Sequence, residues 1–149
     1  MHHVTNDVER LGDYAVLILK ETKYMKENEV KLNEKTKEEF REIYKNITEM
    51  FDLGYVALTE RSIENLKKIS SLQKKTKKLI NATKDEHVVR LSAGMYPVEV
   101  SNSIYSVLFS FQRIAAHIVN IAFSIRSTTG SKQEAFQVIE REKGKLKNA

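Results

Sequence analysis

Two acidic residues near the start of the chain have the types and spacing for chemistry. Glu9 and Asp13 are four positions apart, so on a helix their carboxylates stand one turn apart on the same face. His2 and Asn6 extend this polar face toward the N-terminus. Such ligand types at this spacing suit a hard cation. The pair predicts a metal site on the outer face of a helix, with an ordinary solvated helix as the alternative.

A glycine lies between the two acids. Gly12 interrupts a strongly helical segment, and a glycine inside a helix costs roughly 1 kcal/mol relative to alanine. This cost indicates that another helix or a ligand comes close at Gly12. Tight packing of a second helix is the favoured explanation.

The acidic segment has a second, altered copy. Residues 9–18 (ERLGDYAVLI) align with residues 112–121 (QRIAAHIVNI). The apolar positions and the arginine are kept, whereas Gln112 and Ala116 replace the two acids. We therefore expect a metal site in the first copy only. In the second copy, we interpret His117 and Asn120 as hydrogen-bonding residues at a helix interface.

Nothing in the sequence indicates catalysis. No nucleophile has an adjacent base, and no glycine-rich phosphate loop is present. A metal-dependent hydrolase would need more converging acids or histidines than the chain offers. We expect a protein that is not an enzyme.

The composition favours one all-helical domain. The 149 residues include 5 glycines, 1 proline and no cysteine, so a single core without disulfides or thiolate metal sites is expected over residues 1–149. The longest apolar tract, residues 104–125, contains several polar residues, which argues against a membrane span. No signal peptide is recognisable, and a cytoplasmic location is expected.

The net charge of +5 comes largely from one lysine-rich region between residues 67 and 78. No aromatic residue lies between Tyr55 and Tyr96, so the platforms for nucleic-acid bases are missing and no nucleic-acid partner is expected. A solvated basic helix is the simplest interpretation. Attraction to acidic lipid headgroups, phosphate or an acidic partner is the alternative.

Apolar periodicity predicts four long helices and a short one. The strongest seam, with alternating spacings of three and four, comprises Ile104, Val107, Phe111, Ile114, Ile118, Ile121 and Ile125. Its helix is expected to start near Pro97 and stop before Thr128. The first helix repeats the seam in Val4, Val8, Leu11, Ala15 and Ile18.

Two helices are expected between the copies. Asn33 is the predicted cap of a helix over residues 34–57, and Thr59 that of a helix over residues 60–93 that ends at Gly94. Short connections favour an antiparallel up-down bundle with a core over about residues 2–127. Ser131 begins a capping box, which predicts a peripheral C-terminal helix over about residues 131–147.

The two copies also resemble a known family. Residues 5–15 (TNDVERLGDYA) closely resemble the signature helix of PhoU-like proteins, roughly (D/N)LERIGD(H/Y)A. Residues 113–122 (RIAAHIVNIA) resemble the second signature, ERIADHxxNIA. The resemblance spans about residues 2–126 and keeps the order of the two motifs.

The resemblance implies a fold of two related three-helix repeats with a signature in the third helix of each. It implies regulation of phosphate uptake, either by a free protein or by the cytoplasmic domain of a sodium/phosphate cotransporter-like protein. Several members bind multinuclear metal clusters through their Glu-x-x-x-Asp motifs. For this chain that implies Glu9 and Asp13 as ligands of iron or another divalent or trivalent cation.

The chain departs from the family at both copies. Gln112 and Ala116 argue against a second metal site. The sequence opens inside the expected third helix, so relative to the family two helices of the first repeat are not included, and we expect either a fragment of a longer protein or a partner chain that completes the fold. A partly exposed seam on residues 4–18 then predicts a homodimer or homo-oligomer. The competing interpretation is a generic helical adaptor that has no phosphate role.

Overall fold

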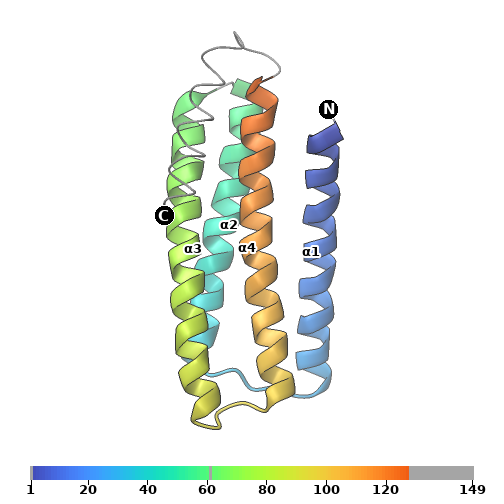
Figure 1. Cartoon of the computed structure of the whole chain (residues 1–149), viewed down its shortest axis with the longest axis vertical. Helices are drawn as coiled ribbons and strands as arrows, with labels where there is room; N and C mark the ends of the chain where they lie inside the picture. The colour runs from blue at the N-terminus through green and yellow to red at the C-terminus, as the bar shows by residue number, and fades with distance from the viewer. Residues whose placement is uncertain (1, 61, 128–149) are drawn as a thin grey trace.

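Four long helices of alternating direction make up the described part of the protein. The computed structural model describes residues 2–60 and 62–127, and the side chains of residues 4–57, 59 and 62–124. The helices are α1 (His2–Glu27), α2 (Glu34–Glu60), α3 (Ile63–Ser92) and α4 (Val98–Ser127) (Figure 1). This arrangement confirms the all-α, up-down bundle. The predicted helix over residues 131–147 lies outside the described residues.

The start of α2 is capped as the sequence predicts. The Asn33 side chain accepts a 2.8 Å hydrogen bond from the backbone N–H of Thr36, which satisfies one of the free donors of the first turn. The Asn33 N–H donates to the hydroxyl of Tyr96 over 2.9 Å. This second bond ties the α1–α2 connection to the segment before α4.

The predicted start of α3 is wrong by three residues. Thr59 lies in the last turn of α2, where its hydroxyl donates to the carbonyl of Tyr55 over 3.2 Å. The cap is Ser62, which has an extended backbone and whose side-chain hydroxyl accepts a 3.3 Å hydrogen bond from the N–H of Asn65. Both residues have capping side chains, and α2 continues past Thr59 because no glycine or proline stops it there.

Two helices end in left-handed residues. Gly94, with φ of 70°, follows α3 at the expected position, and the Met95 N–H donates to the Arg90 carbonyl over 3.0 Å. The same pattern ends α1, where the Val30 N–H donates to the Met25 carbonyl over 2.9 Å. Here the left-handed residue is Glu29, with φ of 51°, although its side chain disfavours this conformation.

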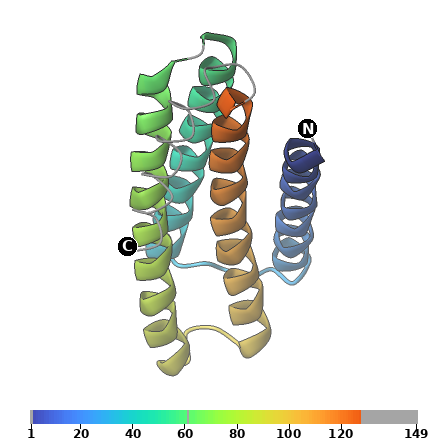
Figure 2. The same cartoon turned by 45° about the horizontal axis from the view of Figure 1, so that its top comes forward.

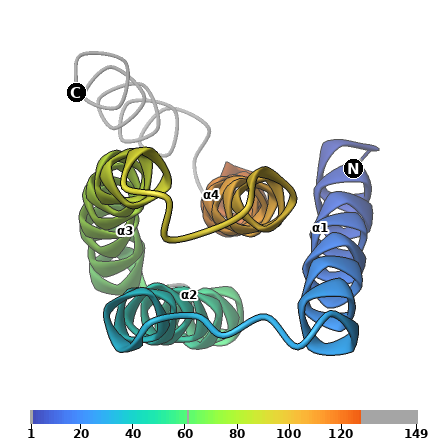
Figure 3. The same cartoon turned by 90° about the horizontal axis from the view of Figure 1, so that it is seen from below.

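The core lies among α2, α3 and α4, each of which packs against the other two. Viewed end-on, α4 lies between α3 and α1 (Figure 3). The helix α1 packs against α4 and has at most marginal contact with the rest (Figure 2). The bundle is therefore a three-helix core with a fourth helix attached to one side. Fully buried apolar residues of the core are Ile43, Met50, Ile69, Ile80, Ile104 and Leu108.

The central helix α4 confirms its predicted seam. Ile104, Val107, Phe111 and Ile118 are buried, and Ile114 and Ile121 are partly buried; the side chain of Ile125 is outside the described set. By length and composition, Val98–Ser124 could also cross a membrane, and 56% of its apolar window is buried inside the bundle. Burial by three neighbouring helices accounts for this apolar sequence without a membrane.

The predicted seam of α1 is only partly correct. Val4, Leu11 and Ile18 are partly buried against α4, but Val8 and Ala15 are exposed. The inner positions between them are taken by Asp7, which is buried, and Tyr14, which is partly buried, and Met25 is buried further along the helix. A helix that touches a single neighbour buries a narrow stripe, and here a polar contact to α4 decides which residues it contains.

Candidate functional site

The two copies of the repeated segment pack against each other across the interface of α1 and α4. Asp7 and His117 are both buried, and Asp7 Oδ1 lies 2.7 Å from His117 Nδ1. Tyr14 stacks on the His117 ring with centroids 5.8 Å apart. The Arg113 guanidinium lies over Tyr14, and its Nε donates to the Tyr14 hydroxyl over 3.3 Å. His117 is thus a hydrogen-bonded interface residue, as predicted, whereas Asn120 is exposed and its predicted place at a helix interface is wrong.

The acidic pair lies on the outer surface of α1. Glu9 and Asp13 are exposed, and Asp13 Oδ2 lies 3.5 Å from Arg10 Nη1 in an exposed ion pair. Among the described residues no three His, Cys, Asp or Glu side chains converge to hold a metal ion. Two carboxylates one turn apart fit part of a hard-cation site, so further ligands would have to come from another chain or from outside the described side chains.

The packing expected at Gly12 is absent from the described part of the chain. A Cβ built on Gly12 would meet nothing within 4 Å, and the residue is exposed. The expectation that a neighbouring helix of the same chain comes close is therefore wrong. The reason is the rotation of α1, which directs Asp7 and Tyr14 toward α4 and leaves Gly12 on the open side.

The two altered positions of the second copy, Gln112 and Ala116, lie on the side of α4 that faces α3. Gln112 accepts a 2.9 Å hydrogen bond from Lys84, and Gln112 and Ala116 line a groove of about 220 Å³ together with Gln73 and Lys77. Lysines of α3 therefore occupy the surroundings of the positions where the first copy has its acids. This environment favours an anion over a metal cation.

A buried ion pair closes the end of the core near the α3–α4 turn. Arg90 donates two hydrogen bonds to Glu39, of 2.8 and 2.9 Å, and a third to the Thr36 hydroxyl over 3.1 Å. The pKa of Arg90 is raised, chiefly by the hydrogen bond to Glu39. Both side chains are less than a tenth exposed, so neither charge can be removed alone without leaving the other buried and unpaired.

His87 is enclosed beside this pair. It is 0% exposed, and neither ring nitrogen has a hydrogen-bond partner among the described residues. Its ring stacks on Tyr96, with centroids 5.6 Å apart, and meets the edge of Tyr105 at 5.0 Å. Burial lowers the pKa of His87, with a smaller contribution from Arg90 and an opposing one from Glu39. The imidazole is therefore held neutral in the core.

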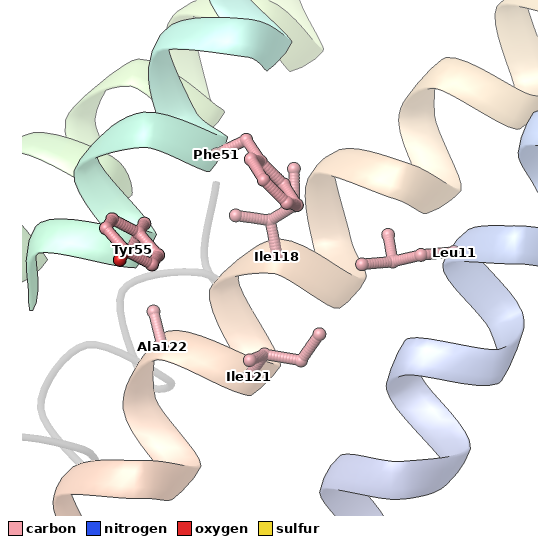
Figure 4. Close-up of a pocket in the computed structure, with 7 residues that line it drawn as sticks. Leu11, Phe51, Tyr55, Ile118, Ile121 and Ala122 are labelled. Atoms are coloured by element: carbon pink, nitrogen blue, oxygen red, sulfur yellow. The ribbon is translucent and has the colours of Figure 1, made fainter. Parts of the chain in front are cut away.

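An apolar groove lies between α1, α2 and α4. It is lined by Leu11, Phe51, Gly54, Tyr55, Ile118, Ile121 and Ala122 and encloses about 80 Å³. Phe51 and Tyr55 project from α2 and Leu11 from α1 over the residues of α4 (Figure 4). Phe51 is 59% and Tyr55 66% exposed, so two large aromatic side chains stand largely in solvent. Rings exposed in this way mark contact surfaces.

The aromatic residues form a stripe along α2. Tyr44, Phe51 and Tyr55 are separated by seven and four positions, so they share one face of the helix. Tyr44 is 63% exposed. We call Tyr44, Phe51 and Tyr55 the α2 stripe. Together with the groove, it has the shape and chemistry that an amphipathic partner helix requires.

The lysine-rich region forms the middle of α3. Lys67, Lys68, Lys75 and Lys78 are exposed, and Lys74 and Lys77 are partly buried. Lys68 pairs with Glu64 at 2.8 Å and Lys75 with Glu42 at 3.5 Å. Two of the six lysines are thus engaged with acids on the bundle surface, which agrees with a solvated basic helix.

Comparisons with known proteins assign no family to the chain. The fold and the site define a helical bundle with a three-helix core, an attached α1 and an apolar groove between them. No family model, no curated protein and no solved structure matches the sequence or the fold. The resemblance to PhoU-like proteins therefore depends on the two motifs themselves.

Three buried polar residues of these interactions were not predicted from the sequence. Asp7, Glu39 and Arg90 are polar residues at helix positions that face the core. Asp7 precedes Leu11 and Ile18 at seam spacing, and Arg90 follows Ile80 and His87 in the same way. A polar residue on an otherwise apolar seam was the available signal, since it predicts a buried partner.

Proposed function

We propose that this chain is a PhoU-like regulatory module in the control of phosphate transport, as the cytoplasmic part of a sodium/phosphate cotransporter-related protein. It acts through protein contacts and not through catalysis. The observation that carries this proposal is the apolar groove beside α4, bordered by the exposed Phe51 and Tyr55. A regulator needs such a surface for its target, and the two motif helices hold it in place by packing α1 on α4.

Phosphate uptake in cells that carry the gene tests the proposal. The gene is deleted and then restored, and the initial rate of uptake of radiolabelled phosphate is measured at scarce and at abundant external phosphate. We expect deletion to weaken the dependence of the rate on external phosphate, and the wild-type chain to restore it. An unchanged dependence after deletion would contradict a role in phosphate control.

A generic helical adaptor is the second candidate. The same groove favours it, because a partner helix of any origin can use exposed aromatic side chains. Transmembrane segments encoded upstream of Met1 would favour the transporter role. A retained partner together with unaltered phosphate uptake would favour the adaptor.

Metal binding at Glu9 and Asp13 is a subsidiary proposal. The ion would be iron or another divalent or trivalent cation, completed by ligands from outside the described side chains. Protein purified without chelators is compared with the Glu9→Ala/Asp13→Ala variant by elemental analysis. The proposal expects a lower metal content in the variant, and equal content in the two samples would refute it.

A further inference from the structure

The outer face of α1 has an exposed apolar stripe, and no described residue of the chain covers it. Taking about 100° per residue, Val8, Gly12, Ala15 and Leu19 fall within an arc of about 60°. Val8 is 55% and Leu19 68% exposed, and Gly12 and Ala15 are exposed as well. We call these four residues the α1 stripe. Val16, 50% exposed, lies at its edge.

Gly12 has no role inside the described chain. A glycine in a helix interior is unfavourable, and nothing lies within 4 Å of its absent Cβ. The glycine and Ala15 make the middle of the stripe flat, while Val8 and Leu19 stand at its two ends. Such a surface lets a second helix approach closely and receive two apolar side chains.

Charged residues beside the α1 stripe indicate which partner helix packs on it. Glu9 and Lys20 lie on the same flank of α1, about 90° and 110° from the centre of the stripe. Both are exposed, and the structure shows no ion pair for either among the described side chains. When two identical helices pair antiparallel about a two-fold axis, the same flank of each helix lies on the same side of the pair. Glu9 of one copy then lies level with Lys20 of the other, twice in each pair.

We infer that two copies of this chain pair antiparallel through their α1 stripes, with Glu9 of each copy against Lys20 of the other. The two-fold axis passes near residues 14 and 15, so that Val8 of each copy packs near Leu19 of its partner. The pairing places Gly12 within one helical turn of the point where the backbones come closest. It does not depend on the proposed role in phosphate control, because it uses only the outer face of α1.

Sedimentation equilibrium of the full chain over a concentration series tests this pairing. We expect a reversible dimer, and Leu19→Glu should raise the dimer dissociation constant about tenfold or more. A monomer at every concentration would overturn the inference. So would a dimer with the same dissociation constant for Leu19→Glu, because it would use another surface.

Gly12→Leu separates pairing from folding. The monomer has open space at this position and gains helix propensity, so its thermal stability should rise or stay equal while the dimer weakens. Asp85→Lys, an exposed change on α3, serves as the matched control and should leave both unchanged. If Gly12→Leu leaves the dimer intact, the close approach at Gly12 is refuted.

Charge reversal gives the sharpest test. Glu9→Lys should raise the dissociation constant by about threefold to tenfold, because like charges then face each other at two sites. The double variant Glu9→Lys/Lys20→Glu should restore it, and high salt should reduce the difference. The dimer should also persist in a chelator, which separates it from any metal-bridged assembly. Failure of the second substitution to restore pairing, or loss of the dimer in chelator, would overturn the antiparallel register.

Discussion

Asp7 Oδ1 lies 2.7 Å from His117 Nδ1, and this buried contact joins α1 to α4. Both residues belong to the repeated segments or their edges, so the two copies are held together by a polar pair inside an apolar interface. Because this contact is buried, it fixes the rotation of α1 and, with it, which face of α1 is exposed. The second ring nitrogen of His117 is buried without a described hydrogen-bond partner.

Removal of Asp7 should weaken the attachment of α1. In Asp7→Ala the His117 ring loses its only described hydrogen-bond partner, which should lower the free energy of unfolding by about 1–3 kcal/mol. Urea unfolding measures this loss, and hydrogen exchange should show the amides of α1 losing protection before those of α3. The exposed change Asp13→Ala should stay within about 0.5 kcal/mol. Equal effects of the two substitutions would contradict this role for Asp7.

The pair of Arg90 and Glu39 should behave as one unit. Arg90→Met leaves the Glu39 carboxylate buried with no cation, and we expect a loss of about 3–5 kcal/mol in the free energy of unfolding. The double variant Arg90→Met/Glu39→Leu should recover most of it, because no unpaired charge remains.

Denaturant unfolding of the two single variants and the double variant measures this coupling. Lys68→Met, at the exposed pair of Lys68 with Glu64, is the matched control and should change stability by less than about 0.5 kcal/mol. Additive effects of the Arg90 and Glu39 substitutions would show that they act separately.

The titration of His87 should lower the free energy of unfolding as the pH falls. Burial lowers its pKa in the folded chain below the ordinary 6.5, so between the two values the unfolded chain binds more protons than the folded one. The contribution is complete above about pH 6.5 and is lost as the pH falls toward the folded value. His87→Phe should lose part of this dependence in unfolding free energies measured from about pH 7.5 to pH 5. An unchanged slope in the variant would mean that His87 does not titrate in this way.

A glycine at position 29 should stabilise the chain. Glu29 adopts a left-handed backbone with φ of 51°, which disfavours every residue with a Cβ. Glu29→Gly should raise the free energy of unfolding by about 1 kcal/mol, measured by thermal or urea unfolding. Glu27→Gly, at the last residue of α1 where the backbone is still helical, should instead lower it. A gain at both positions would contradict the backbone explanation.

Periodicity predicts the fold well because α4 touches three helices. Its seam from Ile104 to Ile121 is buried or partly buried in the described structure, as expected. Periodicity fails on α1, where the apolar Val8 and Ala15 are as regular as Leu11 but exposed. With one neighbour, the helix has more apolar residues than it can bury, and its rotation is decided by Asp7 and His117.

The candidate site was less predictable than the fold. Glu9 and Asp13 stand on an exposed face, as their spacing predicts. The groove could not be predicted, because Met50 and Phe51 are adjacent apolar residues and the sequence does not show which of them is buried. Only the separation of α1 from α2 leaves Phe51 exposed while Met50 is buried. Helix placement in three dimensions, and not spacing along one helix, makes the groove.

Phosphate uptake by cells that express a groove variant tests the central claim most directly. Phe51→Glu/Tyr55→Glu changes two exposed side chains and should leave the circular dichroism spectrum and unfolding temperature close to wild type. In cells without the native gene, we expect this variant to fail to restore the dependence of the initial uptake rate on external phosphate. The matched surface variant Val88→Glu/Val89→Glu, also exposed but on α3, should restore it. Full restoration by the folded groove variant would contradict the account.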